Sequence, residues 1–190
     1  MMAFRRGISN MKKINKWFWV WNLEEEKAFL EEEARKGLIL KSVHLGSYVF
    51  EESEPKDLIY QMDFKGLDRK ISEDEYIQLY EDSGWDLAAR FGSWYYFSQE
   101  SSESGNLRIF NDNASKASVY KRILAFLLLT GFPLYYQMLI FFPNLTNERF
   151  EFPNFYFFFR ILVILFAILH LSALVKIFSM YKKTIGDIRE

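Results

Sequence analysis

The sequence predicts an α+β domain followed by a two-helix transmembrane hairpin, and three observations carry this prediction. A strand–helix–strand–strand unit occurs twice, at residues 15–52 and 57–99, and the two copies align without a gap when Gly84 is placed on Gly37. Two apolar stretches of membrane-spanning length follow the second copy. Residues 22–112 hold 21 acidic and 10 basic residues, a net charge of −11, so the rest of the chain carries +10 to give the overall −1.

The first unit opens with a run rich in aromatic and β-branched residues, Lys16–Trp21, which favours a strand. Asn22 is expected to cap the following helix, with Glu25 three residues on as in a capping box. Gly37 is expected to end that helix in the left-handed conformation. The two strands of the hairpin that follows are expected at residues 38–43 and 47–51.

The second unit repeats this order. Residues 57–64 alternate, with Gln61 and Asp63 on the face opposite four apolar side chains, which predicts a sheet that is wet on one side. Ser72 and Glu75 form a capping box, and the strands expected after Gly84 are residues 85–91 and 94–97.

Two such units combine most economically into one antiparallel-rich sheet of about six strands with both helices on one face. Either Met1 or Met11 could be the natural start of the chain. The expected organisation is a disordered extension at 1–11, the α+β domain at 12–105, a juxtamembrane segment at 106–122, a transmembrane helix at 123–142, an extracytoplasmic loop at 143–154, a second transmembrane helix at 155–178 and a tail at 179–190.

The first apolar stretch, residues 123–142, contains no charged residue. At about 1.5 Å per residue it crosses a hydrocarbon core of roughly 30 Å. Basic residues precede this stretch and follow the second one, whereas the connecting loop holds only Arg149. The positive-inside rule then predicts a two-pass protein of the bacterial cell membrane, with both termini and the α+β domain in the cytoplasm.

Catalytic motifs are absent from the sequence. It has no cysteine, no glycine-rich phosphate loop and no metal-spaced cluster, so we expect neither an enzyme nor a bound cofactor or metal. Its two histidines lie in different modules; His44 is expected on the surface and His170 in a helix–helix hydrogen bond. The acidic triplets Glu24–Glu26 and Glu31–Glu33 are interpreted as solvated helix faces. The acidic domain disfavours direct nucleic-acid binding.

Aromatic residues occur on both faces of the same predicted strands. Tyr95 and Phe97 match core positions of the first copy, so their neighbours should point away from the core. This second aromatic face is either covered by another layer, such as residues 106–120 or a second copy of the chain, or it is a docking surface for a protein or an apolar ligand. The candidate binding residues are Trp17, Trp19, Trp21, Trp94 and Tyr96.

Several segments, in order, resemble one bacterial family, the domain of unknown function 2812. The run K-W-F-W-V-W-N-L-E-E-E-K, the hairpin G-S-Y-V-F-E and the hairpin F-G-S-W-Y-Y-F carry the resemblance, which covers about residues 12–120. It implies a membrane-anchored cytoplasmic domain, often encoded beside PadR-type transcriptional regulators, and hence a regulator as partner. The family brings no catalytic motif with it.

Two hypotheses about function follow. The first is a membrane-tethered cytoplasmic protein-interaction module that senses for, or sequesters, a transcriptional regulator; its acidic surface would complement a basic DNA-binding face. The alternative is a cytoplasmic sensor domain that binds an apolar or amphiphilic small molecule in a pocket between the sheet and the juxtamembrane helix. The lipid bilayer is the expected partner in both, and a homo-oligomer is a further expectation.

Overall fold

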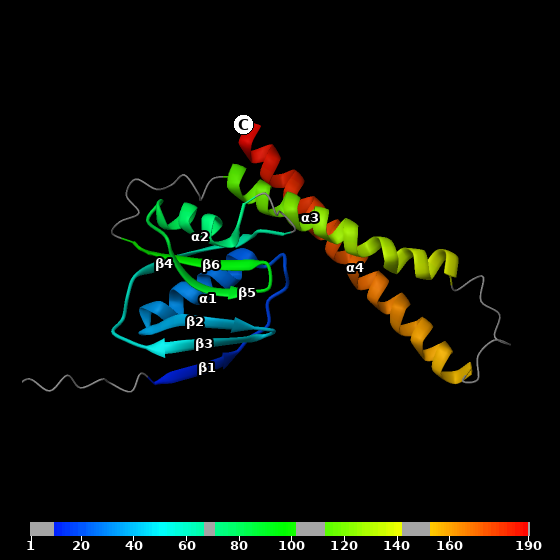
Figure 1. Cartoon of the computed structure of the whole chain (residues 1–190), viewed down its shortest axis with the longest axis horizontal. Coiled ribbons are helices and arrows are strands. Elements are labelled where there is room, and N and C mark those ends of the chain that lie inside the picture. Colours follow the sequence, from blue (N-terminus) through cyan, green and yellow to red (C-terminus); the bar gives the residue numbers. More distant parts are fainter. Residues whose placement is uncertain (1–9, 67–70, 102–112, 142–152, 190) are drawn as a thin grey trace, which may run out of the picture. The chain divides into compact units, whose positions relative to one another are not determined.

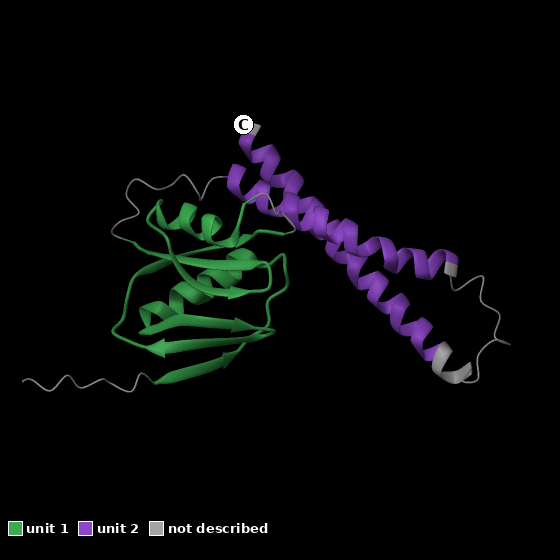
Figure 2. Ribbon diagram, viewed as in Figure 1, with its two compact units in different colours: residues 1–112 green, residues 113–190 purple. Residues whose placement is uncertain are grey.

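The computed structural model describes residues 10–66, 71–101, 113–141 and 153–189, and the chain divides into two compact units, residues 1–112 and 113–190 (Figure 2). Most of the predicted N-terminal extension, the first part of the predicted juxtamembrane segment and nearly all of the predicted extracytoplasmic loop lie outside the described residues. All of the described strands belong to the first unit, and the described residues of the second are helical.

Two three-stranded antiparallel sheets form the first unit (Figure 1). The α+β class is therefore confirmed, but the strands form two sheets where a single one was expected. In each sheet the second strand of a hairpin lies in the middle. Sheet A has the order β1 (Met11–Asn15), β3 (Ser47–Glu52), β2 (Leu38–His44), and sheet B has the order β4 (Leu58–Phe64), β6 (Trp94–Glu100), β5 (Asp86–Phe91).

The edge strands β2 and β5 lie side by side where the two sheets meet. Each of them carries a register shift at the corresponding point, between Leu40 and Ser42 in β2 and between Leu87 and Ala89 in β5. A bulge bends its strand and interrupts the hydrogen-bond ladder. Bulged edges therefore explain why the six strands do not join into one sheet.

The two helices of this unit cover different surfaces. Helix α1 (Leu23–Arg35) packs between the sheets, and its buried side chains share one core with sheet A and with one face of sheet B. Helix α2 (Glu73–Glu81) covers the other face of sheet B, where Tyr95 and Phe97 lie. The expectation that both helices share one face is wrong, because sheet B is apolar on both faces and needs a cover on each.

The aromatic run at residues 16–21 is not a strand, contrary to the sequence prediction. The first strand is β1, five residues earlier, which pairs with β3 as far as Asn15 opposite Ser47. Ser47 is the first residue of β3, so the residues that follow β1 meet no further strand. One backbone bond continues the contact, from the amide of Lys16 to the oxygen of Gly46 at 3.1 Å.

The two helix N-termini differ. At α2 the predicted capping box is present: the Glu75 amide donates to Ser72 Oγ at 3.2 Å, and the Ser72 amide donates to Glu75 Oε2 at 2.8 Å. At α1 the predicted box is wrong, because Asn22 makes no side-chain bond to the helix backbone. Its amide nitrogen donates to the Glu25 carboxylate instead.

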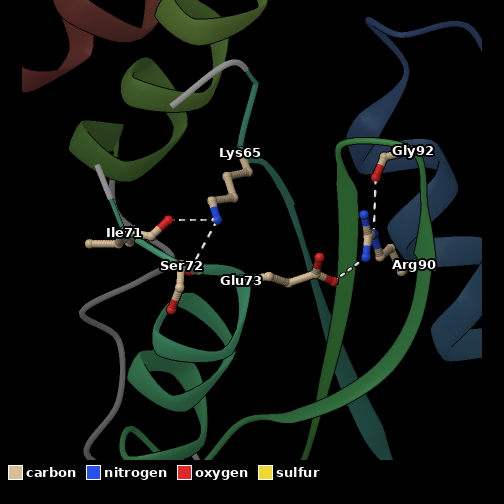
Figure 3. Close-up of polar contacts among 6 residues, drawn as sticks. All are labelled: Lys65, Ile71, Ser72, Glu73, Arg90 and Gly92. Carbon is tan, nitrogen blue, oxygen red and sulfur yellow. Dashed lines mark hydrogen bonds and ion pairs between the residues drawn. The ribbon is translucent and has the colours of Figure 1, made fainter. Parts of the chain in front are cut away.

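Two cations hold the start of α2 against sheet B (Figure 3). Lys65, which follows β4, donates from Nζ to the backbone oxygens of residues 71 and 72, both at 3.1 Å. Arg90 on β5 pairs with Glu73 in the first turn of α2, and its Nε donates to the oxygen of Gly92 at 3.2 Å. These contacts fix the angle at which α2 begins, although exposed ion pairs of this kind contribute little to stability.

The second unit is a helical hairpin of α3 (Asn113–Tyr136), a π-helical turn η3 (Gln137–Phe141) and α4 (Pro153–Arg189), with α3 packed on α4. Two helices are long and apolar enough to span a membrane, and most of their large apolar side chains are exposed. The terminal helical hairpin is therefore confirmed. The described parts of the predicted spans, 123–142 and 155–178, lie within helices that extend beyond them.

A polar contact joins the two long helices. The hydroxyl of Tyr135 and Nδ1 of His170 are hydrogen-bonded at 3.0 Å, which confirms the helix–helix bond predicted for His170. Gly131 allows this close approach, because a Cβ atom there would lie 2.8 Å from Cε1 of His170. A small residue at a helix crossing lets two helices pack closely.

Candidate functional site

A cavity of about 150 Å³ lies within the first unit and is the candidate functional site. Its walls come from the segment after β1, the start of α1, the β2–β3 turn and the β5–β6 hairpin. Trp17, Trp19, Trp94 and Tyr96 line it, so four of the five residues singled out from sequence lie around one cavity. The fifth, Trp21, is not part of the lining, but its ring stacks on Trp19 at 5.2 Å.

The mouth of the cavity carries two exposed tryptophans. Trp17 and Trp19 are 54% and 42% exposed, and their rings meet edge to face at 5.6 Å. Phe18, between them, points inward and packs on Phe29 at 5.6 Å. The alternation predicted for a strand is therefore present in a segment that has no strand partner.

Trp94 and Tyr96 face the interior. Tyr96 is buried in the core between the sheets, and the half-buried Trp94 packs against the same core, with its ring 5.0 Å from that of Phe64. The layer that covers this aromatic face includes α1. Residues 106–120, the layer considered from sequence, are described only from Asn113 on.

Glu26, on α1, is the one carboxylate among the described residues that line the cavity, and it is 7% exposed. Its Oε1 accepts hydrogen bonds from the hydroxyls of Tyr48 at 2.7 Å and Tyr96 at 2.8 Å. Burial raises the pKa of Glu26 above its ordinary value, and the two hydrogen bonds partly offset that rise. The interpretation of Glu24–Glu26 as a solvated face is therefore wrong at this residue.

The two phenols at this carboxylate serve as hydrogen donors. Burial, together with the negative charge of Glu26, raises the pKa of Tyr48 and of Tyr96 far above that of a free tyrosine. Both hydroxyls therefore stay protonated throughout the physiological range. Both also donate to the same oxygen, Oε1, and no described residue donates to Oε2 of Glu26.

Sequence reasoning missed Glu26, although a signal was present. Leu30 and Ala34 are buried on the inward face of α1, and Glu26 precedes them by one and two turns at the same i, i+4 spacing. The run of three consecutive glutamates, Glu24–Glu26, concealed this, because a run of charges ordinarily marks a solvated face. His44, expected on the surface, is exposed at the rim of the cavity.

A second buried carboxylate lies on the far face of sheet B. Asp63 is 3% exposed, and its Oδ2 accepts the hydroxyls of Tyr76 and, at 2.7 Å, of Tyr80, while the amide of Phe64 donates to Oδ1 at 2.9 Å. Asp63 and Gln61 were expected on a wet face, which is wrong because α2 covers that face. Both oxygens of Asp63 are bonded within the fold, so it is a structural group.

The family model described as protein of unknown function DUF2812 matches residues 22–132, more than half of the chain. The chain belongs to the DUF2812 family. The matched region contains Glu26, Tyr48 and Tyr96, whereas Trp17 and Trp19 precede it. Comparison with curated proteins and with solved structures found no significant match.

Within the described part of this DUF2812 chain, no group of three or more histidine, aspartate or glutamate side chains is placed to hold a metal ion. Besides Glu26 and His44, the described residues that line the cavity include no ionisable side chain except the two tyrosines. The arrangement offers an aromatic mouth, apolar walls and one acidic group at depth. Those features suit binding, and they provide no nucleophile with an adjacent base.

Proposed function

We propose that this DUF2812 protein is a membrane-tethered sensor whose cytoplasmic domain binds a small apolar or amphiphilic molecule in the cavity of the first unit. The observation that supports it is the convergence of aromatic side chains from separate segments on a cavity with one polar group at depth, the usual composition of a ligand pocket. A volume of about 150 Å³ suits a body of one aromatic ring.

The proposal is tested with full-length protein in lipid nanodiscs and a panel of single-ring aromatic compounds. All five tryptophans lie in the first unit, so tryptophan emission reports on that unit alone. The Val20→Phe variant adds volume at a half-buried residue that lines the cavity, and Val49→Phe makes the same change at a half-buried residue of β3 outside the lining.

We expect saturable emission changes for at least one compound in the wild type and in Val49→Phe, and a loss of at least about 10-fold in affinity in Val20→Phe, because a filled cavity excludes the ring. Equal affinity in all three proteins, or a flat titration across the whole panel in the wild type, would exclude the cavity as the binding site.

The tether is the helical hairpin of the second unit. Its two apolar helices and the basic residues outside them support a two-pass topology with both termini in the cytoplasm. The chain has no cysteine, so a single introduced cysteine reports its own location. A membrane-impermeant maleimide applied to intact cells should label a cysteine placed within residues 143–152. It should leave Gly92→Cys unlabelled until the cells are lysed. The reverse labelling pattern would show that the termini lie outside the cytoplasm.

A second function, capture of a PadR-type transcriptional regulator, is favoured by the exposed pair Trp17 and Trp19 on a domain of net charge −11 over residues 22–112. A photo-crosslinking residue at position 17 should then capture that regulator in cells, whereas one at the equally exposed Leu79 on α2 should not. Capture of a second copy of the chain would make the tryptophan pair a dimer contact, and equal capture from both positions would contradict a specific surface.

A further inference from the structure

The charge pattern of the cavity is one-sided. Glu26 supplies a carboxylate, and among the described residues that line the cavity there is no lysine or arginine to pair with it. The carboxylate is more than nine-tenths buried, with Oε1 taken by two tyrosine hydroxyls and Oε2 left without a donor among the described residues. A buried carboxylate without a cation is costly, and the raised pKa of Glu26 reflects that cost.

The walls above this carboxylate are aromatic rings. Trp17, Trp19 and Trp94 line the cavity, and no described residue places a cation over any of the three. Lysine Nζ groups of this unit do lie over other rings, such as Lys16 over Phe29 at 4.2 Å. Tryptophan is the ring that attracts cations most strongly, and desolvation at a pocket strengthens that attraction.

We propose that the cavity selects a small organic ammonium ion, whose charged nitrogen pairs with Oε2 of Glu26 and whose apolar body contacts the tryptophan rings. This inference rests on the proposed function and narrows the class of ligand. An ammonium group supplies the donor that Oε2 lacks and the charge that the carboxylate lacks. A neutral alcohol of the same shape can donate a hydrogen bond to Oε2 but leaves the charge of the carboxylate unpaired, and an anion adds repulsion.

The test compares three ligands of nearly one shape at pH 7.5: benzylamine, a cation; benzyl alcohol, its neutral isostere; and benzoate, an anion. Calorimetric titration uses full-length protein in zwitterionic nanodiscs. We expect benzylamine to bind at least about 10-fold more tightly than benzyl alcohol, because only the ammonium ion adds the attraction of opposite charges to its hydrogen bond with the carboxylate. We expect benzoate to give no saturable signal.

Three variants test which residues cause the preference for benzylamine over benzyl alcohol. Glu26→Gln keeps the shape and an acceptor oxygen for the tyrosines but removes the charge, and it should abolish the preference for benzylamine over benzyl alcohol. Glu25→Gln removes an exposed charge one residue away on α1 and should keep it. Trp19→Leu changes a ring that is 42% exposed, so folding should be preserved, and it should weaken benzylamine by about 3-fold with a smaller effect on benzyl alcohol.

The outcomes separate this inference from the proposed function. Equal affinity for benzylamine and benzyl alcohol in the wild type, with both lost in Val20→Phe, overturns the ammonium assignment and leaves the ligand pocket standing. No binding of any of these ligands or of the wider aromatic panel overturns both. The wild-type comparison decides the ligand class even if Glu26→Gln fails to fold.

Discussion

A buried carboxylate lies against each face of sheet B, Glu26 from α1 on one face and Asp63 from β4 on the other, and both accept hydrogen bonds from tyrosines. On one face Glu26 accepts two tyrosine hydroxyls, and on the other Asp63 accepts two more. At Asp63 the second oxygen accepts a backbone amide, whereas at Glu26 the second oxygen has no described donor and the side chain lines a cavity. The two carboxylates therefore differ in whether both of their oxygens are hydrogen-bonded within the fold.

A buried carboxylate is stable when its lone pairs are satisfied, and a site that satisfies them internally has nothing left for a ligand. The Asp63 site therefore holds α2 on sheet B and fixes the fold. At the Glu26 site, Oε1 binds the two tyrosine hydroxyls and holds α1 between the sheets, whereas Oε2 is left for a ligand in the cavity. Stability and binding are thus divided between two sites of similar composition.

The largest expected change in stability comes from removing each carboxylate in turn. Asp63→Ala leaves two enclosed phenols without acceptors and should cost about 3 kcal/mol of unfolding free energy. Glu26→Ala should cost about 1 kcal/mol, because water in the cavity can reach the phenols and the cost of burying a carboxylate disappears. For a unit of this size, Asp63→Ala then lowers the melting temperature by roughly 15 °C and Glu26→Ala by roughly 5 °C.

Thermal unfolding followed by tryptophan emission measures both changes, because every tryptophan lies in the first unit. Glu81→Ala, an exposed acidic residue of α2, is the matched control and should change stability by less than about 0.5 kcal/mol. Equal losses at Asp63 and Glu26 would show that both carboxylates are structural and would remove the basis of the comparison.

A smaller effect is expected from pH. The pKa of Glu26 in the folded protein lies above its ordinary value of 4.5, so the folded protein keeps a proton that the unfolded chain has lost. The stabilisation from this proton is complete below about pH 4.5 and is lost as pH rises through the folded pKa, by at most about 1.4 kcal/mol per pH unit. The difference in stability between wild type and Glu26→Gln should fall across this window and then level off.

The measurement is the melting temperature of both proteins from pH 4.5 to 8. The titratable groups that face Glu26 are Tyr48 from β3, Tyr96 from β6 and His44 at the rim from β2. All three are present in both proteins, and the raised pKa values of the two tyrosines keep them neutral over this range. A difference that is independent of pH would mean that Glu26 is not buried as a titrating group.

Local signals in the sequence predicted the regular elements well. Gly37 was expected to end its helix in the left-handed conformation, and its φ is 82°; Gly84, which aligns with it, has a φ of 80°. The capping box at Ser72 and most of the strand bounds were also predicted, because the residues that decide them are neighbours in the chain. The cap at Asn22 failed because its backbone, with φ −97° and ψ 36°, is not in the extended conformation of an N-cap; its side-chain nitrogen donates to Glu25 instead.

Long-range signals were weaker. Alternation at residues 16–21 predicted a strand, but a strand also needs a partner, and β3 begins at Ser47 opposite Asn15. Alternation at residues 57–64 placed Asp63 towards solvent, since sequence does not show that α2 lies over it. Four of the five aromatic site residues line the cavity, yet Glu26 at its depth was concealed among the neighbouring charges.

The smallest expected effect is the loss of a single tyrosine hydroxyl at each of the two carboxylates. Tyr80→Phe removes one of the two phenol donors to enclosed Asp63 and should cost about 1.5 kcal/mol, while Tyr96→Phe at Glu26 should cost about 0.5 kcal/mol, because water in the cavity replaces the lost donor. The Tyr96 bond lowers the pKa of Glu26, so Tyr96→Phe should also move the pH-dependent loss of stability to higher pH. Melting curves recorded at a series of pH values measure both effects. A larger loss of stability in Tyr96→Phe than in Tyr80→Phe, with no shift of the pH at which stability falls, would contradict the prediction. It would mean that the hydrogen bonds of Glu26 are satisfied within the fold as fully as those of Asp63.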